Sequence, residues 1–290
     1  MSGGKYVLVG LGYDEDGRPE LDWAANEALA RETALRVVRA YDPAEFIEYW
    51  TAPPAPSVLE ELRGDNEQTL EAALAHTRRQ WPELVVHGHI AEGSAAQLLV
   101  ETSREAALTV VGSRQLSTVG AMALGSVSST VIAMADGPVV VVGNRVTEPV
   151  AEPAVVLGVD GSVGMPAALE FAFEYADRHH RPVRAVSCWH HDLLEVTPWP
   201  QAHDGPGIAE TWLADTLIGW QHKYPNVPVR RDVVHEHPVA GLVAASAGHD
   251  LLVVGSHGQH AVARIGSVSQ GVLHHARCPV AVVHPRGGTT

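Results

Sequence analysis

Short apolar runs alternate with longer mixed segments along most of the chain. In the first half, runs rich in Val and Leu occupy residues 6–11, 35–41, 84–89, 108–111 and 138–142. Segments rich in Ala, Leu and Glu lie between them and are typical of helices, as at residues 21–31, 66–80 and 95–105. Strands that alternate with helices predict a parallel sheet with helices on both faces. Right-handed crossovers then favour a doubly wound layout.

The second half of the chain repeats the first. Similar blocks recur in the same order, pairing residues 7–12 with 155–160, 21–24 with 169–172, 110–113 with 253–256, 125–128 with 266–269, and 138–142 with 279–283. The offset falls from 148 to 143 and then to 141, so the second copy is shorter around its fourth strand. This duplication predicts two similar domains, at residues 1–147 and 154–290.

Three segments interrupt the pattern. Residues 42–58 and 190–208 are rich in Pro, Gly and aromatic side chains and are predicted to be loops that serve as lids or interface elements. Residues 147–153 contain two prolines and two glutamates and are the predicted linker.

Composition narrows the class of protein further. The 290 residues are 46% hydrophobic and 19% charged, which is enough to form packed cores. The formal net charge of −14 disfavours nucleic acid and anionic lipid as partners. With no run of about 18–20 apolar residues and no signal-type start, the sequence predicts a cytoplasmic protein without membrane contact. The two cysteines, Cys188 and Cys278, do not have a metal-type spacing.

A glycine-rich turn follows the fourth strand of the second copy. Gly255-Ser256-His257-Gly258 precedes a variable loop, and Gly266-Ser267-Val268-Ser269 then opens a helical segment. Ser267 is the predicted N-cap of that helix. A helix start next to glycines presents backbone N–H groups and a positive dipole end to an anion such as phosphate. The alternative is that these residues only form the turn and cap the helix.

This arrangement resembles the universal stress protein family. In that family a strand is followed by Gly, two residues, Gly, nine residues and Gly-Ser, with an Asp at the end of the first strand and a Pro before the last strand. The resemblance covers both halves, as in tandem-type members. It implies two flavodoxin-like, adenine nucleotide alpha hydrolase-like domains, each with a mostly parallel five-stranded sheet. It also implies an adenine-nucleotide site for ATP, with or without Mg²⁺, in at least one half.

Each copy departs from the family pattern. In the first, Gln115 replaces the second glycine, and Gly12 stands where the family has its Asp. In the second, Asp160 is present, but only seven residues separate Gly258 from Gly266. The resemblance assigns candidate nucleotide-binding residues to the second copy at Asp160, Gly161, Val186, Gly255, His257, Gly258, Gly266, Ser267, Val268 and Ser269. It assigns them to the first copy at Gly12, Val38, Gly112, Gly125, Ser126, Val127 and Ser128.

Most catalytic signatures are missing from the sequence. The two lysines, Lys5 and Lys223, lie far from any Gly-rich turn, which excludes a Walker loop. No nucleophile elbow, zincin motif or Cys-x-x-Cys occurs. No enzyme is therefore predicted. A slow ATPase at Asp160 and Ser267 would lack a general base other than Asp160 itself.

Histidine is concentrated in the second half, which holds 14 of the 17. A metal site or a pH sensor would explain this, and so would ordinary surface side chains, because the members of pairs such as His179-His180 point in different directions. No metal site is predicted.

Two hypotheses for the function follow. The first is a tandem, adenine-nucleotide-binding regulatory module with a role in the stress response. The second is a scaffold of the same fold that acts through protein–protein contacts, with both nucleotide sites degenerate. The apolar last strands, 139–142 and 280–283, predict pairing within the chain as a pseudo-dimer or between chains as a homodimer.

Overall fold

The computed structural model describes residues 5–12, 18–43, 55–115, 122–143, 150–162, 164–189, 206–256 and 265–284. The chain divides into two units by its internal contacts. One comprises Met1–Ser113 and Gly125–Val142, and the other comprises Arg114–Leu124 and Gly143–Thr290.

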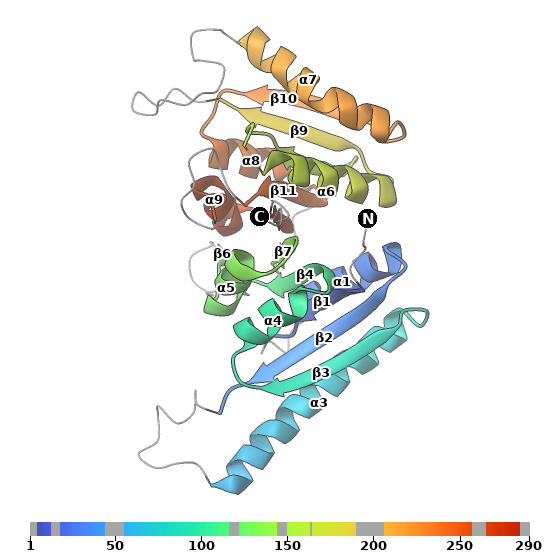
Figure 1. The fold of residues 1–290 in the computed structure, drawn as a ribbon, viewed down its shortest axis with the longest axis vertical. Coiled ribbons are helices and arrows are strands. Elements are labelled where there is room, and N and C mark those ends of the chain that lie inside the picture. Colours follow the sequence, from blue (N-terminus) through green and yellow to red (C-terminus); the bar gives the residue numbers. More distant parts are fainter. Residues whose placement is uncertain are drawn as a thin grey trace, which may run out of the picture. The chain divides into compact units, whose positions relative to one another are not determined.

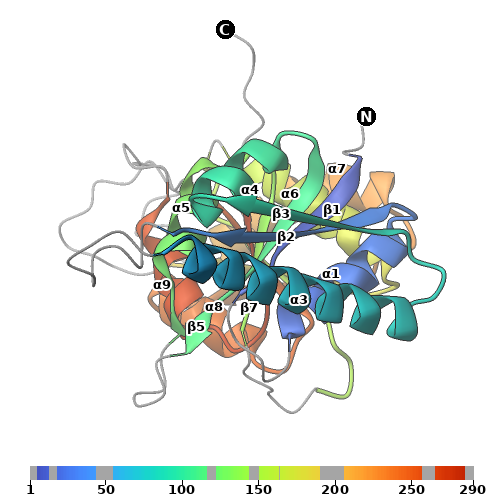
Figure 2. The same cartoon turned by 90° about the horizontal axis from the view of Figure 1, so that it is seen from below.

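The first unit is a five-stranded parallel sheet with strand order β3-β2-β1-β4-β7. Its strands are β1 (Tyr6–Gly10), β2 (Ala34–Tyr41), β3 (Val86–Glu92), β4 (Ala106–Gly112) and β7 (Val139–Val142). One face is covered by α1 (Pro19–Ala30) and α3 (Pro56–Gln80), and the other by α4 (Ala95–Ser103) and α5 (Ser126–Met134) (Figure 1). Figure 2 shows α3 and α4 on opposite sides of β2 and β3.

The second unit repeats this topology with strand order β10-β9-β8-β11-β12. Its strands are β8 (Val155–Gly158), β9 (Val183–Cys188), β10 (Val229–Val234), β11 (Leu251–Gly255) and β12 (Val280–Val283). Helices α6 (Met165–Arg178) and α7 (Pro206–Lys223) cover one face, and α8 (Pro238–Ser246) and α9 (Ser267–His275) cover the other (Figure 1). A short antiparallel pair, β5 (Arg114–Gln115) with β6 (Met122–Ala123), groups with this unit.

The central strands are apolar because both of their faces are buried. In the first unit Leu8 and Val110 have no exposed surface, and in the second the same is true of Leu157 and Val253. Burying this apolar surface is the main stabilising contribution to each unit. The predicted fold class is confirmed for both halves of the chain.

Three differences between the predicted element bounds and the structure have a clear physical reason. Helices α3 and α7 begin at Pro56 and Pro206, inside the segments predicted as loops. Proline suits the first helical position because its fixed φ is helical and its missing N–H is not needed there. Strand β3 begins at Val86, because Leu84 lies in a turn in which its N–H donates to the carbonyl of Trp81 (3.0 Å). Residues 44–54, 190–205 and 147–149 lie outside the described residues.

Across the described ranges, no helix is long and apolar enough to span a membrane.

Candidate functional site

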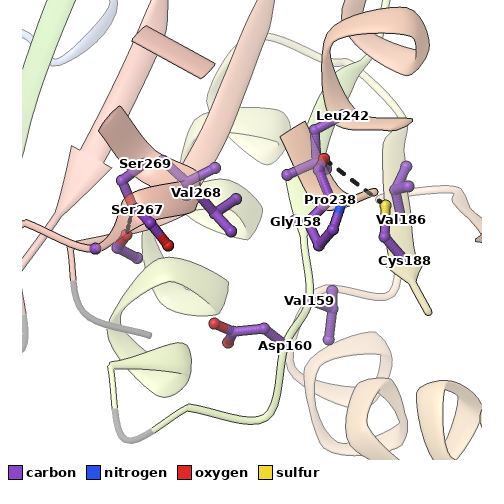
Figure 3. Close-up of a pocket in the computed structure, with 13 residues that line it drawn as sticks. Gly158, Val159, Asp160, Val186, Cys188, Pro238, Leu242, Ser267, Val268 and Ser269 are labelled. Atoms are coloured by element: carbon purple, nitrogen blue, oxygen red, sulfur yellow. Dashed lines mark hydrogen bonds between the residues drawn. The ribbon is translucent and has the colours of Figure 1, made fainter. Parts of the chain in front are cut away.

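The strand order of the second unit creates a crevice at one edge of its sheet. Strands β8 and β11 are neighbours, and the connections that follow them lead to opposite faces of the sheet. In doubly wound sheets, ligands bind at this switch point, beyond the carboxyl ends of the strands. A cavity of about 110 Å³ lies there, lined by Gly158, Val159, Asp160, Val186, Cys188, Pro238, Leu242, Val254, Gly255, Gly266, Ser267, Val268 and Ser269 (Figure 3).

One side of this pocket is the start of α9. Gly266 is the N-cap, and its N–H donates to the carbonyl of Ser256 (2.7 Å). The Ser269 hydroxyl donates to the carbonyl of Gly255 (2.6 Å), which ties the first turn of the helix to the end of β11. We call this hydroxyl-to-carbonyl bond the serine clasp. It holds the N–H groups of the first turn of α9 beside the pocket, where an anion would be stabilised.

The predicted N-cap was wrong by one residue. Ser267 is the first helical residue and is exposed, whereas Gly266 has the extended backbone of a cap (φ −71°, ψ 156°) and accepts the N–H of Gln270 (3.0 Å). Glycine is among the residues favoured at this position. The Ser267 hydroxyl is therefore not used as a cap.

Asp160 lies at the carboxyl edge, two residues beyond the end of β8. Its Oδ1 accepts the N–H of Ser162 (3.0 Å), and Gly161 between them has the positive φ (+69°) that a glycine adopts without strain. The turn thus orients the carboxylate. Figure 3 shows this carboxylate pointing to the side of the pocket where α9 begins.

The other side of the pocket is apolar and comes from β9 and α8. Val186 is 1% exposed, and its carbonyl accepts the N–H of Val159 (2.9 Å), so only its side chain can face a ligand. Cys188 lies on the same face of β9, two residues beyond the position that pairs with Gly158, the last residue of β8. Leu242 and Pro238 on α8 complete this side (Figure 3).

The sequence analysis identified Val186 and missed Cys188. Side chains alternate between the two faces of a strand, so residue 188 lies on the same face as residue 186 and nearer the carboxyl edge. This alternation could have predicted Cys188 from the sequence. Burial raises the pKa of the Cys188 thiol to about 11, with a smaller contribution from Glu236. The thiol is therefore neutral at physiological pH. A Cβ on Gly241 would lie 2.8 Å from its sulfur, so α8 approaches closely because residue 241 is glycine.

The first unit has the same backbone arrangement at the corresponding edge. Gly125 is the N-cap of α5, with Ser126 and Val127 in the first turn, and the Ser128 hydroxyl donates to the carbonyl of Gly112 (2.8 Å). Val38 is 2% exposed, and its carbonyl accepts the N–H of Leu11 (2.9 Å). Both units thus have a serine clasp.

The two units differ at the end of the first strand of each sheet. Gly12 offers no carboxylate, and its carbonyl and that of Leu11 accept hydrogen bonds from the Arg39 guanidinium (3.1 Å to Leu11). Arg39 is 4% exposed and also donates to Oδ1 of Asn66 (2.7 Å). The backbone of residues 11–12, just after β1, is thus held by a buried cation.

Four sequence-predicted features cannot be placed. His257 and Gly258 lie outside the described residues, as do the side chain of Gln115 and the shortened loop of the second copy. Among the residues that are described, no group of three or more His, Cys, Asp or Glu side chains could hold a metal ion.

These features define a class of protein: doubly wound α/β domains with a pocket at the carboxyl edge of the sheet. Comparison with known proteins narrows the class. The universal stress protein family matches residues 5–143 and 153–284. The chain belongs to this family and is a tandem member, as the sequence analysis predicted.

Two mycobacterial relatives match over nearly their whole length. The chain is 32% identical over 297 residues to a universal stress protein of Mycolicibacterium smegmatis, covering 97% of each chain. It is 34% identical over 289 residues to universal stress protein Rv2623 of Mycobacterium tuberculosis, covering 95% of each. These relatives carry a stress-protein name rather than that of an enzyme, in line with the prediction that this chain is not one.

Solved structures agree in fold. A universal stress protein of Archaeoglobus fulgidus superimposes with a TM-score of 0.71 at 17% identity, covering 99% of this chain and 98% of that one. A putative universal stress protein of Pseudomonas aeruginosa gives 0.66 at 14% identity, covering 98% and 95%. The domain bounds 1–147 and 154–290 stay a prediction.

Proposed function

We propose that this tandem universal stress protein is a regulatory module that binds an adenine nucleotide in its second unit. The observation that carries the proposal is the arrangement of the pocket. It has a carboxylate at the end of β8, an apolar wall from β9 and α8, and a glycine-capped helix start opposite (Figure 3). ATP, with or without Mg²⁺, is the proposed ligand.

Each part of the pocket suits one part of such a nucleotide. The wall of Val186, Cys188 and Leu242 can pack against a flat base. The carboxylate of Asp160 can accept hydrogen bonds from ribose hydroxyls. The N–H groups at the start of α9, beyond the capping Gly266, can bind phosphate.

The backbone groups at the end of β9 suit a purine that carries both a hydrogen-bond donor and an acceptor. The N–H of Trp189 donates to Val234 of β10 (2.9 Å), so the backbone groups of the preceding Cys188 point the other way, past the end of β8. An N–H and a carbonyl on one residue match the ring nitrogen acceptor and amino donor of adenine. We propose that Cys188 reads the base in this way.

The structure of the first unit favours a scaffold function for the first half of the chain. Its turn retains the serine clasp of Ser128, but Gly12 provides no side chain for a ribose. We propose that this half acts as the scaffold, with interdomain or intersubunit pairing of β7 and β12 as the means of assembly. Residence in the cytoplasm and a role in the stress response complete the proposal.

Titration of the purified protein tests the ligand. We expect calorimetry to show about one ATP bound per chain and much weaker binding of GTP, because guanine carries its donors and acceptor in the opposite order. Heating the untreated protein and separating the released small molecules would show whether a nucleotide co-purifies. Equal affinity for GTP, or no heat with either nucleotide, would contradict the proposal. The second result would favour the scaffold.

Alkylation of the two cysteines tests where the nucleotide binds. Both thiols react slowly, because burial raises the pKa of each to about 11. Cys188 lines the pocket, whereas Cys278 is 6% exposed and lies outside the pocket lining. ATP at about ten times its Kd should slow alkylation of Cys188 about tenfold and leave Cys278 unchanged, measured by mass spectrometry. Equal protection of both thiols would indicate general tightening instead of occupancy.

A further inference from the structure

The segment that leads into β8 is held to the second unit at the amino edge of its sheet. The N–H of Val150 donates to the carbonyl of Gly248 (3.1 Å), and the N–H of Asp250 donates to the carbonyl of Ala154 (3.2 Å). Between these two bonds, the N–H of Ala154 donates to Nδ1 of His249 (3.1 Å). Among these bonds, this third one alone uses an acceptor that titrates near neutral pH.

The geometry fixes the proton of the neutral imidazole. Because Nδ1 accepts the Ala154 N–H, it carries no hydrogen, and the hydrogen of the neutral ring is on Nε2. Nε2 lies 3.5 Å from Nη1 of Arg184, which is too long for a well-formed hydrogen bond, and this Nη1 donates instead to the carbonyl of Ala245 (3.0 Å). Adding a proton at Nδ1 places two N–H groups face to face, so the bond to Ala154 is lost. It also places a second cation beside the Arg184 guanidinium.

The charged groups around the ring come from several elements. Arg184 on β9, Arg230 on β10 and Asp250 before β11 act on the ring. Their ion-pair partners are Asp232 on β10, Glu152 in the leading segment and Arg181 before β9. Each carboxylate is paired with an arginine: Asp232 with Arg184 (2.5 Å), Asp250 with Arg181 (2.5 Å), and Glu152 with Arg230. Helix α8 contributes the carbonyl of Ser246, which accepts the backbone N–H of His249 (3.1 Å).

These surroundings disfavour the imidazolium. Burial, followed by the charge of Arg184, lowers the pKa of His249 below its ordinary value of 6.5, with Asp250 opposing and Arg230 adding to the effect. A lowered pKa means that the folded state binds this proton less readily than the unfolded state. The contribution of His249 to stability is complete above pH 6.5 and is lost as the pH falls through the lowered value.

At the corresponding amino edge of the first unit, a tyrosine replaces Ala154. With the offset of 148 residues between the two repeats, Tyr6 corresponds to Ala154 and Arg36 to Arg184. The Tyr6 hydroxyl donates to the carbonyl of Thr102 (2.9 Å), and Arg36 lies 4.0 Å from its ring centroid. Burial raises the pKa of Tyr6 above 10.0, so this phenol stays neutral throughout the range in which His249 titrates.

We propose that His249 is a pH-sensitive latch: its neutral imidazole holds residues 150–154 against the second unit, and protonation of Nδ1 releases them. The latch is independent of any bound nucleotide. It responds to acid through the second unit only.

Hydrogen–deuterium exchange of the full chain tests the latch. Exchange of the peptide that contains Ala154 is compared at about pH 7.5 and about pH 5.5, after correction for the intrinsic pH dependence of exchange. We expect protection of this amide to fall about five- to tenfold at the lower pH. Protection of the amides of β1 in the first unit should not change. Equal protection of Ala154 at both pH values would overturn the proposal.

Matched variants separate the latch from general acid effects. His249→Asn keeps an acceptor near the place of Nδ1 without titrating, so its Ala154 amide should remain protected at both pH values. His249→Ala lacks the acceptor and should be unprotected at both. His222→Asn, at an exposed position near the end of α7, should behave like the wild type. Loss of protection at low pH in His249→Asn would also overturn the proposal.

Discussion

Nucleotide binding by the second unit is expected to be lost in the Gly266→Glu variant. Gly266 is buried at the N-cap of α9 and lines the pocket, so a glutamate there occupies the proposed phosphate position and adds a negative charge to it. Juxtaposed like charges cost several kcal/mol, which corresponds to a loss of affinity of about a hundredfold or more. The measurement is ATP titration by calorimetry, together with the rise in melting temperature that ATP causes.

The duplicated chain provides a matched control for this substitution. Gly125→Glu places the same side chain at the N-cap of α5 in the first unit. We expect ATP binding to survive in Gly125→Glu and to be absent in Gly266→Glu, while circular dichroism remains that of the wild type in both. Unchanged ATP binding by Gly266→Glu would contradict the assignment of the nucleotide site to the second unit. Loss in Gly125→Glu alone would move the site to the first unit.

The Arg39→Met variant is expected to destabilise the first unit by about 3 kcal/mol. The buried guanidinium donates to the carbonyls of Leu11 and Gly12 and to Asn66. Methionine removes this donor, and the acceptors on Leu11 and Asn66 are buried. The free energy of unfolding is measured in urea, and local exchange of the β1 amides assigns the loss to this unit.

Arg63→Ala is the control for removal of an arginine from the same unit. Arg63 is exposed on α3 and pairs with Glu67 one helical turn away (2.7 Å). Exposed pairs of this kind contribute little to stability, because solvent and salt screen them. If Arg39→Met costs no more than Arg63→Ala, the guanidinium does not hold the backbone of residues 11–12.

The sequence was sufficient to predict the fold because its main determinants are local and repeated. Apolar runs, helical segments and the matched Gly-Ser blocks placed the strands and helices of both units and indicated that a ligand site lies at the carboxyl edge. The repeat also placed Asp160 and Gly12 at equivalent positions, so the asymmetry between the two edges could be predicted. The placement of the elements and the placement of Asp160 and Gly12 both depend on short sequence blocks, whose residues are close together in the chain.

The features that the sequence did not reveal depend on contacts between distant residues. Cys188 joins the pocket because β8 ends at Gly158 while β9 continues, and that difference in length is a property of the sheet. The many histidines of the second half were evident. The part-buried contact of His249 with Ala154 depends on the segments that precede β11 and β8, in which the two residues are 95 positions apart. The buried position of Arg39 depends likewise on Asn66 of α3.

The serine clasp also has a kinetic consequence. Because Ser128 and Ser269 donate to the carbonyls of Gly112 and Gly255 within the folded units, the first turns of α5 and α9 are held at the strand ends by folding alone. A ligand that reaches either helix start does not have to order that first turn as it binds, so the entropic cost of ordering this backbone is not subtracted from its affinity. Encounter with such a preorganised edge is limited by diffusion and orientation. Differences in affinity between ligands should therefore appear mainly in how fast they leave.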